Sequence, residues 1–158
     1  MANTAQQISP EGLSFIKLFQ GFSAEPYLDE CHLWVVGYGH LIQENETFVL
    51  PLSRQQAQTL LVEDIHACQE MLKHELQVQL TQSQYDALVS LALSIGPQTL
   101  AGSAILRLIN QRRFPEAMAL WQADIEMNGI RGNGLNIQRQ AECTLFGIAL
   151  DGKLTGAE

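Results

Sequence analysis

The chain has 158 residues, 46% of them hydrophobic and 16% charged, which excludes a disordered chain and suits one compact domain with a hydrophobic core. Its formal net charge is −8, with eleven acidic and three basic side chains in residues 1–100 and six of each in residues 101–158. We therefore expect no nucleic-acid partner, because phosphates would be repelled, and no membrane span, because no apolar run approaches the roughly 20 residues that one needs.

The first predicted helix covers residues 10–20. Ser9 can cap its free N–H groups, and Pro10 has the fixed φ that suits the first helical position. Apolar residues then recur at every third position until Gly21, where the pattern stops. The helix is therefore expected to be short.

A β-hairpin is predicted after this helix. Residues 27–29 and 33–36 are short extended runs, and residues 37–40, Gly-Tyr-Gly-His, form a glycine-marked turn. Residues 41–52 show no periodic pattern and are expected to be irregular. The hairpin would therefore form a small lobe directly after the first helix.

The rest of the chain is predicted to be helical. A capping box at Ser53–Gln56 begins a long amphipathic helix over about residues 53–75. A second capping box, Thr81–Gln84, begins an apolar helix that ends at Gly96 and should be the buried centre of a larger lobe. Three further helices are expected at about residues 103–112, 115–124 and 136–149. A glycine-rich connection, residues 128–134, is expected before the last of them.

These elements predict an α+β, mostly helical fold in which a small hairpin lobe and a larger helical lobe flank a cleft. The whole chain, residues 1–158, is expected to form one domain. Residues 10–52 would hold the first helix and the hairpin lobe, residues 53–75 the connecting helix, and residues 76–150 the helical lobe. A cleft between two lobes suits an extended substrate, although this pattern does not identify the substrate.

The sequence shows no pattern typical of a metal or cofactor site. Cys31, Cys68 and Cys143 match no zinc-binding or disulfide spacing, so all three are expected to be reduced thiols. No metal and no cofactor are predicted, and the oligomeric state is left open. The first residues lack the basic start and apolar segment of a secretory signal, so we expect the chain to be cytoplasmic at synthesis. Transfer to the periplasm or cell wall would then depend on a phage or a secretion system.

A series of short motifs runs through about residues 9–150. The motifs are Phe19-Gln20-Gly21, Tyr27-Leu28-Asp29, Leu33-Trp34-Val35-Val36-Gly37-Tyr38-Gly39-His40, Leu60-Leu61-x-x-Asp64, Leu80 to Ser90, Gly134-Leu135 and Arg139-x-x-Glu142-x-x-Leu145-Phe146. In this order and at this spacing they resemble the signature of phage-type lysozymes, the endolysins of glycoside hydrolase family 24. The resemblance implies a lysozyme-like fold and peptidoglycan as the substrate class.

The resemblance also implies three catalytic positions. In that family a Glu at the end of the first helix protonates the leaving glycosidic oxygen. An Asp nine residues on and a Thr six residues beyond it position and activate a water. The matching residues here are Gln20, Asp29 and Val35, so only the aspartate is retained.

The two substitutions remove groups that glycoside hydrolysis needs. One carboxylic acid normally donates a proton while a second carboxylate acts as base, nucleophile or charge stabiliser. A glutamine amide has no proton to transfer near neutral pH, so Gln20 removes a general-acid contribution of about 10²–10⁴-fold. Val35 has the shape of threonine without the hydroxyl that would hold the water. Glu25 and Glu30 lie close in sequence, but a misplaced carboxyl loses most of its effect.

Other residues of these motifs are candidates for binding or support. Tyr27, Trp34, Gly39 and His40 are candidate substrate-binding residues. His40 is also expected to form a structural hydrogen bond with Asp64, because both lie in motifs that join the small lobe to the long helix. A lone histidine with no second ligand at metal spacing does not indicate a zinc site.

The leading hypothesis is a lysozyme-fold protein that has lost most or all muramidase activity and acts by binding peptidoglycan, its fragments or another protein. The alternative is an active muramidase that uses another acid, or a variant in which Gln20 has replaced a catalytic Glu. A third hypothesis is a regulator that presents the acidic residues 1–100 to a basic partner. Salt should weaken such binding, since exposed charges are screened over about 8 Å at physiological ionic strength.

Overall fold

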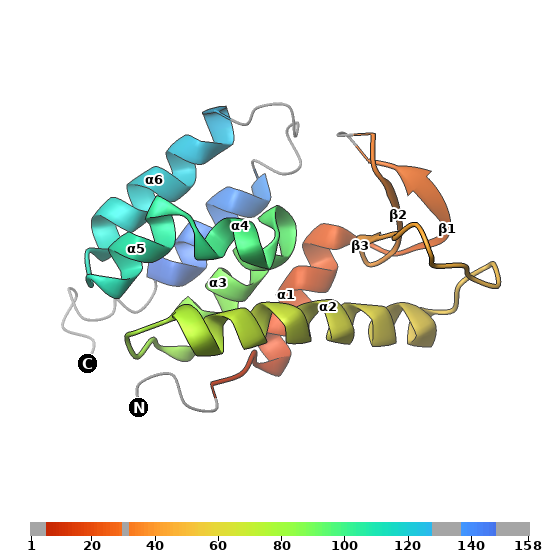
Figure 1. Cartoon of the computed structure of the whole chain (residues 1–158), viewed down its shortest axis with the longest axis horizontal. Helices are drawn as coiled ribbons and strands as arrows, with labels where there is room; N and C mark the ends of the chain where they lie inside the picture. The colour runs from red at the N-terminus through yellow and green to blue at the C-terminus, as the bar shows by residue number, and fades with distance from the viewer. Residues whose placement is uncertain (1–5, 30–31, 128–136, 148–158) are drawn as a thin grey trace.

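The computed structural model describes residues 6–29, 32–127 and 137–147, and within these ranges all side chains except those of residues 123–127. Figure 1 shows the sheet at one end of the molecule, α3 to α6 at the other, and α2 running along both. The predicted α+β fold is confirmed. The elements are α1 (Pro10–Gln20), β1 (Ser23–Leu28), β2 (Trp34–Gly37), β3 (His40–Leu41), α2 (Arg54–Glu75), α3 (Gln82–Ile95), α4 (Pro97–Ala101), α5 (Ala104–Asn110) and α6 (Phe114–Met127), and residues 137–147 are also helical.

Helix α1 is fixed at both ends by local chemistry. Ser9 Oγ accepts a hydrogen bond from Gly12 N–H at 3.0 Å, as predicted for the N-cap. Gly21, at a φ of +70°, ends the helix, and its N–H donates to the Lys17 carbonyl at 2.9 Å. Gln20 is therefore the last helical residue and lies where the chain turns into the sheet.

The predicted hairpin is present as part of a three-stranded antiparallel sheet of order β1-β2-β3. β1 begins at Ser23, four residues before the first extended run of the sequence. β3 was not predicted, because a strand of only two residues is too short to show any alternation of apolar and polar side chains.

The sheet has two faces that differ in what they contact. Side chains directly opposite each other on antiparallel strands share a face. The register therefore defines a Val35 face, made of Tyr27, Val35 and Leu41, and a Val36 face, made of Leu28, Trp34, Val36 and His40. Val36 packs against Ala57 of α2, so α2 covers part of the Val36 face.

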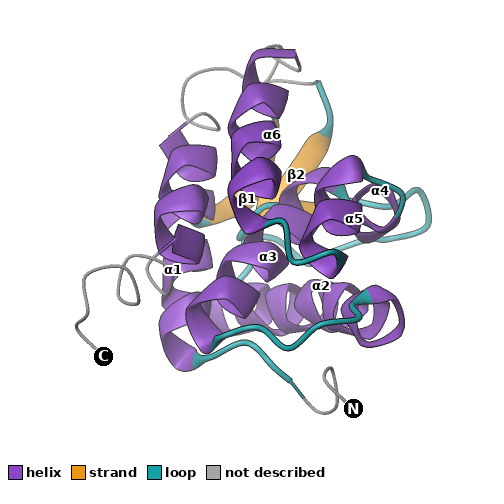
Figure 2. Ribbon diagram, turned by 90° about the vertical axis from the view of Figure 1, so that its left-hand side faces the viewer, coloured by secondary structure: helices purple, strands orange, loops and turns teal. Residues whose placement is uncertain are grey.

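Both predicted capping boxes are present. Ser53 Oγ accepts from Gln56 N–H at 3.0 Å while Gln56 Oε1 accepts from Ser53 N–H at 2.8 Å. Thr81 and Gln84 repeat this exchange at 3.2 and 3.0 Å. α3 is the buried centre of the helical lobe, as predicted, because every residue from Gln84 to Ala92 is buried. Figure 2 shows the other helices arranged around it.

The other helices differ from the predictions in detail. α4 was not predicted, because Gly96 and Pro97 indicate the end of a helix, yet proline also suits the first position of a new one. α5 begins after its N-cap Ser103 and is shorter than expected, whereas α6 extends further than expected. The glycine-rich residues 128–134 and Cys31 lie outside the described residues.

The apolar core consists of two clusters. The larger one fills the helical lobe and includes Trp121 and Phe146, both fully buried. The smaller one lies between the sheet and α2 and is formed by Val36, Leu52 and Ala57. Since α2 contributes side chains to both clusters, it ties the two lobes together.

The described part of the chain has neither a membrane-spanning helix nor a candidate metal site. It contains no helix that is both long and apolar enough to cross a bilayer. Within the same ranges, no group of three or more His, Cys, Asp or Glu side chains is suited to hold a metal ion. Cys68 and Cys143 are buried free thiols, and burial raises the pKa of each to about 12, so both stay protonated at neutral pH.

Candidate active site

Gln20 ends α1, and its side chain lies against the turn between β2 and β3. A Cβ placed on Gly39 would come within 2.2 Å of Gln20 Oε1, so only a glycine leaves room for the carboxamide. Gly39 also has a φ of +76°, which other residues adopt only with strain. The predicted site residues Gln20 and Gly39 are therefore in direct contact.

Val35 occupies the middle of the Val35 face, between Tyr27 and Leu41 on the neighbouring strands. Tyr27 and Leu41 are 40% and 43% exposed, whereas Val35 is only 6% exposed. The position that the sequence motifs predict to correspond to the family's threonine is therefore apolar and buried.

Asp29 follows β1 and closes the outer end of the β1–β2 hairpin. Its Oδ1 accepts a hydrogen bond from Leu33 N–H at 2.9 Å, and its carbonyl accepts one from His32 N–H at 2.9 Å. Burial and, to a smaller extent, the negative charge of Asp29 raise the pKa of Tyr27, so these two side chains lie near each other. Asp29 thus holds the turn in addition to standing at a predicted catalytic position.

His40 is held between two carboxylates and is only 7% exposed. Its Nδ1 lies 2.8 Å from Asp64 Oδ2, and its Nε2 lies 2.9 Å from Glu46 Oε1. The hydrogen bond to Asp64 is the main cause that raises the pKa of His40 to about 9; burial opposes this rise and the bond to Glu46 adds to it. His40 is therefore a cation at neutral pH whose two N–H groups are both used. The predicted bond to Asp64 is present, and no ring nitrogen is left for a substrate.

Two residues of this region were missed by the sequence analysis. Glu46 lies in a segment without periodic pattern, and its Oε1 also accepts from Gln43 N–H at 2.8 Å. Burial favours the protonated form of Glu46, but the hydrogen bonds from Gln43 and His40 outweigh it and lower its pKa. Leu41 joins the Val35 face only through the pairing of β2 with β3, for which the sequence gives no local signal.

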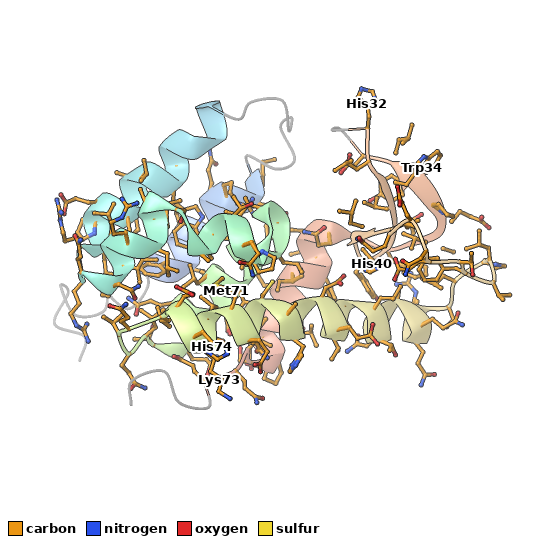
Figure 3. The ribbon with its side chains drawn as sticks, viewed as in Figure 1. His32, Trp34, His40, Met71, Lys73 and His74 are labelled. Carbon is orange, nitrogen blue, oxygen red and sulfur yellow. The ribbon has the colours of Figure 1, made fainter. Side chains whose placement is uncertain are left out.

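Trp34 lies on the Val36 face rather than the Val35 face, and it is 54% exposed. Figure 3 shows Trp34 and His32 toward the outer end of the hairpin, while His40 lies near α2. The structure does not bring Trp34 together with Gln20, so its contact with a substrate stays a prediction.

The side chains at this site combine polar and apolar groups. Gln20 supplies an amide, Asp29 a carboxylate and Tyr27 a phenol, and Leu41 supplies apolar surface beside the buried Val35. A few polar groups beside an apolar, partly aromatic surface are typical of a binding site for a small organic molecule such as a sugar. Of the three predicted catalytic positions, Gln20, Asp29 and Val35, only Asp29 carries an acid.

Comparison with known proteins identifies relatives over most of the chain. The Phage lysozyme family model matches residues 17–142. An endolysin of Acyrthosiphon pisum secondary endosymbiont phage 1 is 35% identical over 143 residues, covering 88% of this chain and 97% of that protein. The solved muramidase domain of SpmX from Asticaccaulis excentricus has a TM-score of 0.75 at 30% identity, covering 89% of this chain and 97% of that one. An endolysin from Escherichia coli O157:H7 phage FAHEc1 shares the fold, with a TM-score of 0.78 at 24% identity and coverage of 92% and 96%.

Proposed function

This chain belongs to the phage lysozyme family, and from that membership we propose that it binds peptidoglycan or its fragments and cleaves them slowly or not at all. The family implies peptidoglycan as the substrate. The observation that carries the proposal is the amide of Gln20, which ends α1 and contacts Gly39 where the family has a glutamate.

The first supporting argument concerns proton donation. A glycosidic oxygen leaves readily only when an acid protonates it, and a carboxamide has no such proton near neutral pH. Loss of a general acid typically lowers the rate by about 10²–10⁴-fold. The Gln20 amide can still donate and accept hydrogen bonds, so it can hold a sugar that it does not help to cleave.

The second supporting argument concerns the attacking water. An ordered water needs about two to four polar partners. Val35 offers none, and it is buried between Tyr27 and Leu41. The side chain at this position therefore does not help Asp29 to hold or activate a water.

The protein keeps the surface that glycan binding needs, although it lacks the groups that cleavage needs. Tyr27 and Leu41 remain exposed on either side of Val35, which leaves a phenol ring and an aliphatic side chain for contact with a sugar. Asp29 adds a carboxylate near Tyr27, and Gln20 adds an amide against Gly39 in the turn that follows β2. This combination supports glycan binding without efficient hydrolysis.

Binding is tested by incubating the protein with purified peptidoglycan and measuring how much of it sediments with the insoluble wall. We expect sedimentation that decreases when Tyr27 is changed to Ala. Leu28→Ala is the matched control, because Leu28 is the next residue of β1 and is similarly exposed, at 47%, but lies on the other face. A protein that stays in the supernatant would contradict wall binding and favour a protein partner.

Loss of catalysis is tested by restoring the family's residues. We expect Gln20→Glu with Val35→Thr to clear peptidoglycan suspensions, and a third change, Asp29→Asn, to abolish the restored activity. Restoration by Gln20→Glu alone would favour an engineered or recent loss of the acid. No activity in the double variant would indicate that the site has diverged further.

An active muramidase would require a different acid. Glu25 is exposed on β1, and Glu30 lies outside the described residues. If the unaltered protein hydrolyses peptidoglycan, Glu25→Gln and Glu30→Gln identify which of the two supplies the proton, and our proposal is then wrong.

A further inference from the structure

Four side chains from four parts of the chain stack where the two lobes meet. Lys17 Nζ of α1 lies 5.4 Å from the centre of the Tyr38 ring, in the turn between β2 and β3. The Tyr38 and Phe22 ring centres are 5.6 Å apart, with an angle of 56° between the rings. Arg54 Cζ, at the start of α2, lies 4.3 Å from the centre of the Phe22 ring. We call this group the interlobe stack.

Each contact along the interlobe stack is attractive. A cation is attracted to the face of an aromatic ring, and two rings in a tilted arrangement attract each other. Each end of the stack is a cation and the middle is a ring pair, so every neighbour contributes a favourable contact. The stack thereby holds together four segments: α1, the α1–β1 connection, the β2–β3 turn and α2.

Tyr38 is the member that joins the two apolar clusters. Its ring packs against the larger cluster in the helical lobe and also against the smaller cluster beneath the sheet. Of the described residues, no other partly buried side chain packs against both. A change in the Tyr38 ring therefore affects how one lobe is placed on the other.

Tyr38 directly precedes Gly39 in the turn between β2 and β3. Gly37 and Gly39 on either side of it both have positive φ, at 69° and 76°. These glycines give the turn its shape, and the Tyr38 ring is the side chain that anchors the turn between them. Gly39 in turn contacts the Gln20 carboxamide.

We propose that Tyr38, held by the interlobe stack, is a positioning residue that keeps Gly39 against Gln20 and so sets the geometry of the glycan site. The effect on glycan affinity rests on the proposed function. The effect on the contact between Gln20 and Gly39 does not.

The first experiment measures that contact directly by NMR, without any ligand. A nuclear Overhauser effect between Gln20 Hγ and Gly39 Hα is expected in the unaltered protein, because a Cβ on Gly39 would lie 3.6 Å from Gln20 Cγ. Tyr38→Leu should abolish the signal, and Tyr38→Phe, which keeps the ring, should retain it. A signal that persists in folded Tyr38→Leu would overturn the proposal.

A second variant keeps the test decisive if Tyr38→Leu does not fold. Lys17→Met keeps the aliphatic stem and removes only the cation over the Tyr38 ring. We expect it to fold, to shift the Gly39 amide resonance and to weaken the same signal. Unchanged Gly39 resonances in Lys17→Met would contradict a role for the stack.

The second experiment measures affinity for a soluble N-acetylglucosamine oligomer by calorimetry. Tyr38→Leu should bind about fivefold to tenfold more weakly, the size expected for losing one or two ring contacts, with rescue by Tyr38→Phe. Phe15→Leu is the matched control, since it removes a ring that pairs with Phe19 and packs against the larger cluster alone. It should lower the melting temperature without changing affinity.

The two experiments separate the proposals. If the unaltered protein does not bind the oligomer, the proposed function fails while the NMR result still decides the role of Tyr38. If it binds and both leucine variants lose affinity in proportion to their stability, Tyr38 is only a structural residue and the inference is wrong.

Discussion

The His40 cation lies between the carboxylates of Asp64 and Glu46, where the irregular segment after β3 meets α2. Asp64 and Glu46 are 29% and 28% exposed at their side chains, while His40 is almost fully buried. A shielded ion pair of this kind contributes more than one on an open surface. The group therefore fastens the small lobe to α2 as long as His40 stays protonated.

We expect this contribution to disappear at alkaline pH. The pKa of His40 is about 9 in the folded protein and ordinarily 6.5, so the stabilisation is complete below pH 6.5 and is lost as the pH rises through 9. A shift of this size corresponds to about 3 kcal/mol. Urea unfolding of the unaltered protein and of His40→Gln, at about pH 6 and about pH 10, measures the difference.

The comparison with the variant removes other alkaline effects. Burial raises the pKa of Cys68 and of Cys143, so at alkaline pH these thiols ionise in the unfolded chain before they do in the folded protein. This also lowers the free energy of unfolding as the pH rises. That cost is common to both proteins. The difference in the free energy of unfolding between the unaltered protein and His40→Gln should be smaller at pH 10 than at pH 6. An equal difference at both pH values would contradict the stabilising role of protonated His40.

Gly12 faces the Asp86 carboxylate, which leaves no room for a side chain. A Cβ at Gly12 would lie 2.5 Å from Asp86 Cγ and 2.8 Å from each carboxylate oxygen. The same carboxylate accepts from Ser9 N–H at 3.0 Å and from Gln82 Nε2 at 2.9 Å, so it ties the start of α1 to α3. Glycine is therefore required here by tertiary packing.

We expect Gly12→Ala to lower the free energy of unfolding by about 1–3 kcal/mol, the usual cost of overpacking. This is the opposite of the gain of about 0.5–1 kcal/mol that alanine normally brings to a helix. Ser14→Ala, exposed on the same helix, is the control and should be neutral or stabilising. A more stable Gly12→Ala protein would show that Asp86 can move aside freely.

The helix at residues 137–147 is joined to the rest of its lobe by a buried polar cluster. Glu142 is fully buried and pairs with Arg139, which is 4% exposed. It also accepts from Trp121 Nε1 at 3.1 Å and from Ser90 Oγ. Burial raises the pKa of Glu142, and these donors oppose the rise. The carboxylate thus connects the last described helix to α3 and α6.

We expect Glu142→Gln to destabilise the protein by about 3–5 kcal/mol, because it leaves the Arg139 cation buried without a carboxylate. The matched control is Glu116→Gln, which breaks a pair with Arg113 of the same sequence spacing on an open surface. That change should not move the unfolding midpoint measurably. Equal losses in both variants would mean that burial does not govern the strength of these pairs.

Elements with local signals were predictable from sequence. The caps at Ser9, Ser53 and Thr81 each satisfy backbone groups within four residues, and all three are present. β3 and α4 were missed because elements of two and five residues are too short for a periodic pattern. The bounds of α5 and α6 differ from the predicted ones for another reason, because helix ends depend on packing as well as on caps.

The site was predictable only in part. The motifs predicted the pairing of His40 with Asp64, which the structure contains. They made Gln20 and Gly39 separate candidates and did not indicate that the two are in contact. They did not indicate Glu46 or Leu41, which reach the site through tertiary contacts. They also did not indicate that Val35 lies opposite Tyr27 and Leu41 on the neighbouring strands. Motif spacing identifies which positions match a family, whereas strand register decides which side chains meet.

The distribution of charge determines how the whole protein can meet a cell wall. Residues 1–100, which include the sheet and α2, carry eleven acidic and three basic side chains. Anionic wall polymers would be repelled at long range, so the proposed binding would have to come from short-range contacts at the Val35 face.

We therefore expect salt to strengthen binding to intact cell walls, because it screens the repulsion. Binding to an uncharged N-acetylglucosamine oligomer should not change over the same range. Sedimentation and calorimetry from about 0.05 to 0.3 M salt measure the two effects. Wall binding that weakens with salt would instead favour a basic partner for the acidic residues.

The most direct measurement is the release of new reducing ends from purified, unmodified peptidoglycan by the unaltered protein. A phage endolysin similar to this chain serves as the positive control. We predict no release above that of heat-inactivated protein, because the amide at residue 20 has no proton to give and the valine at residue 35 holds no water. Reducing ends that accumulate in proportion to the amount of unaltered protein would contradict this account.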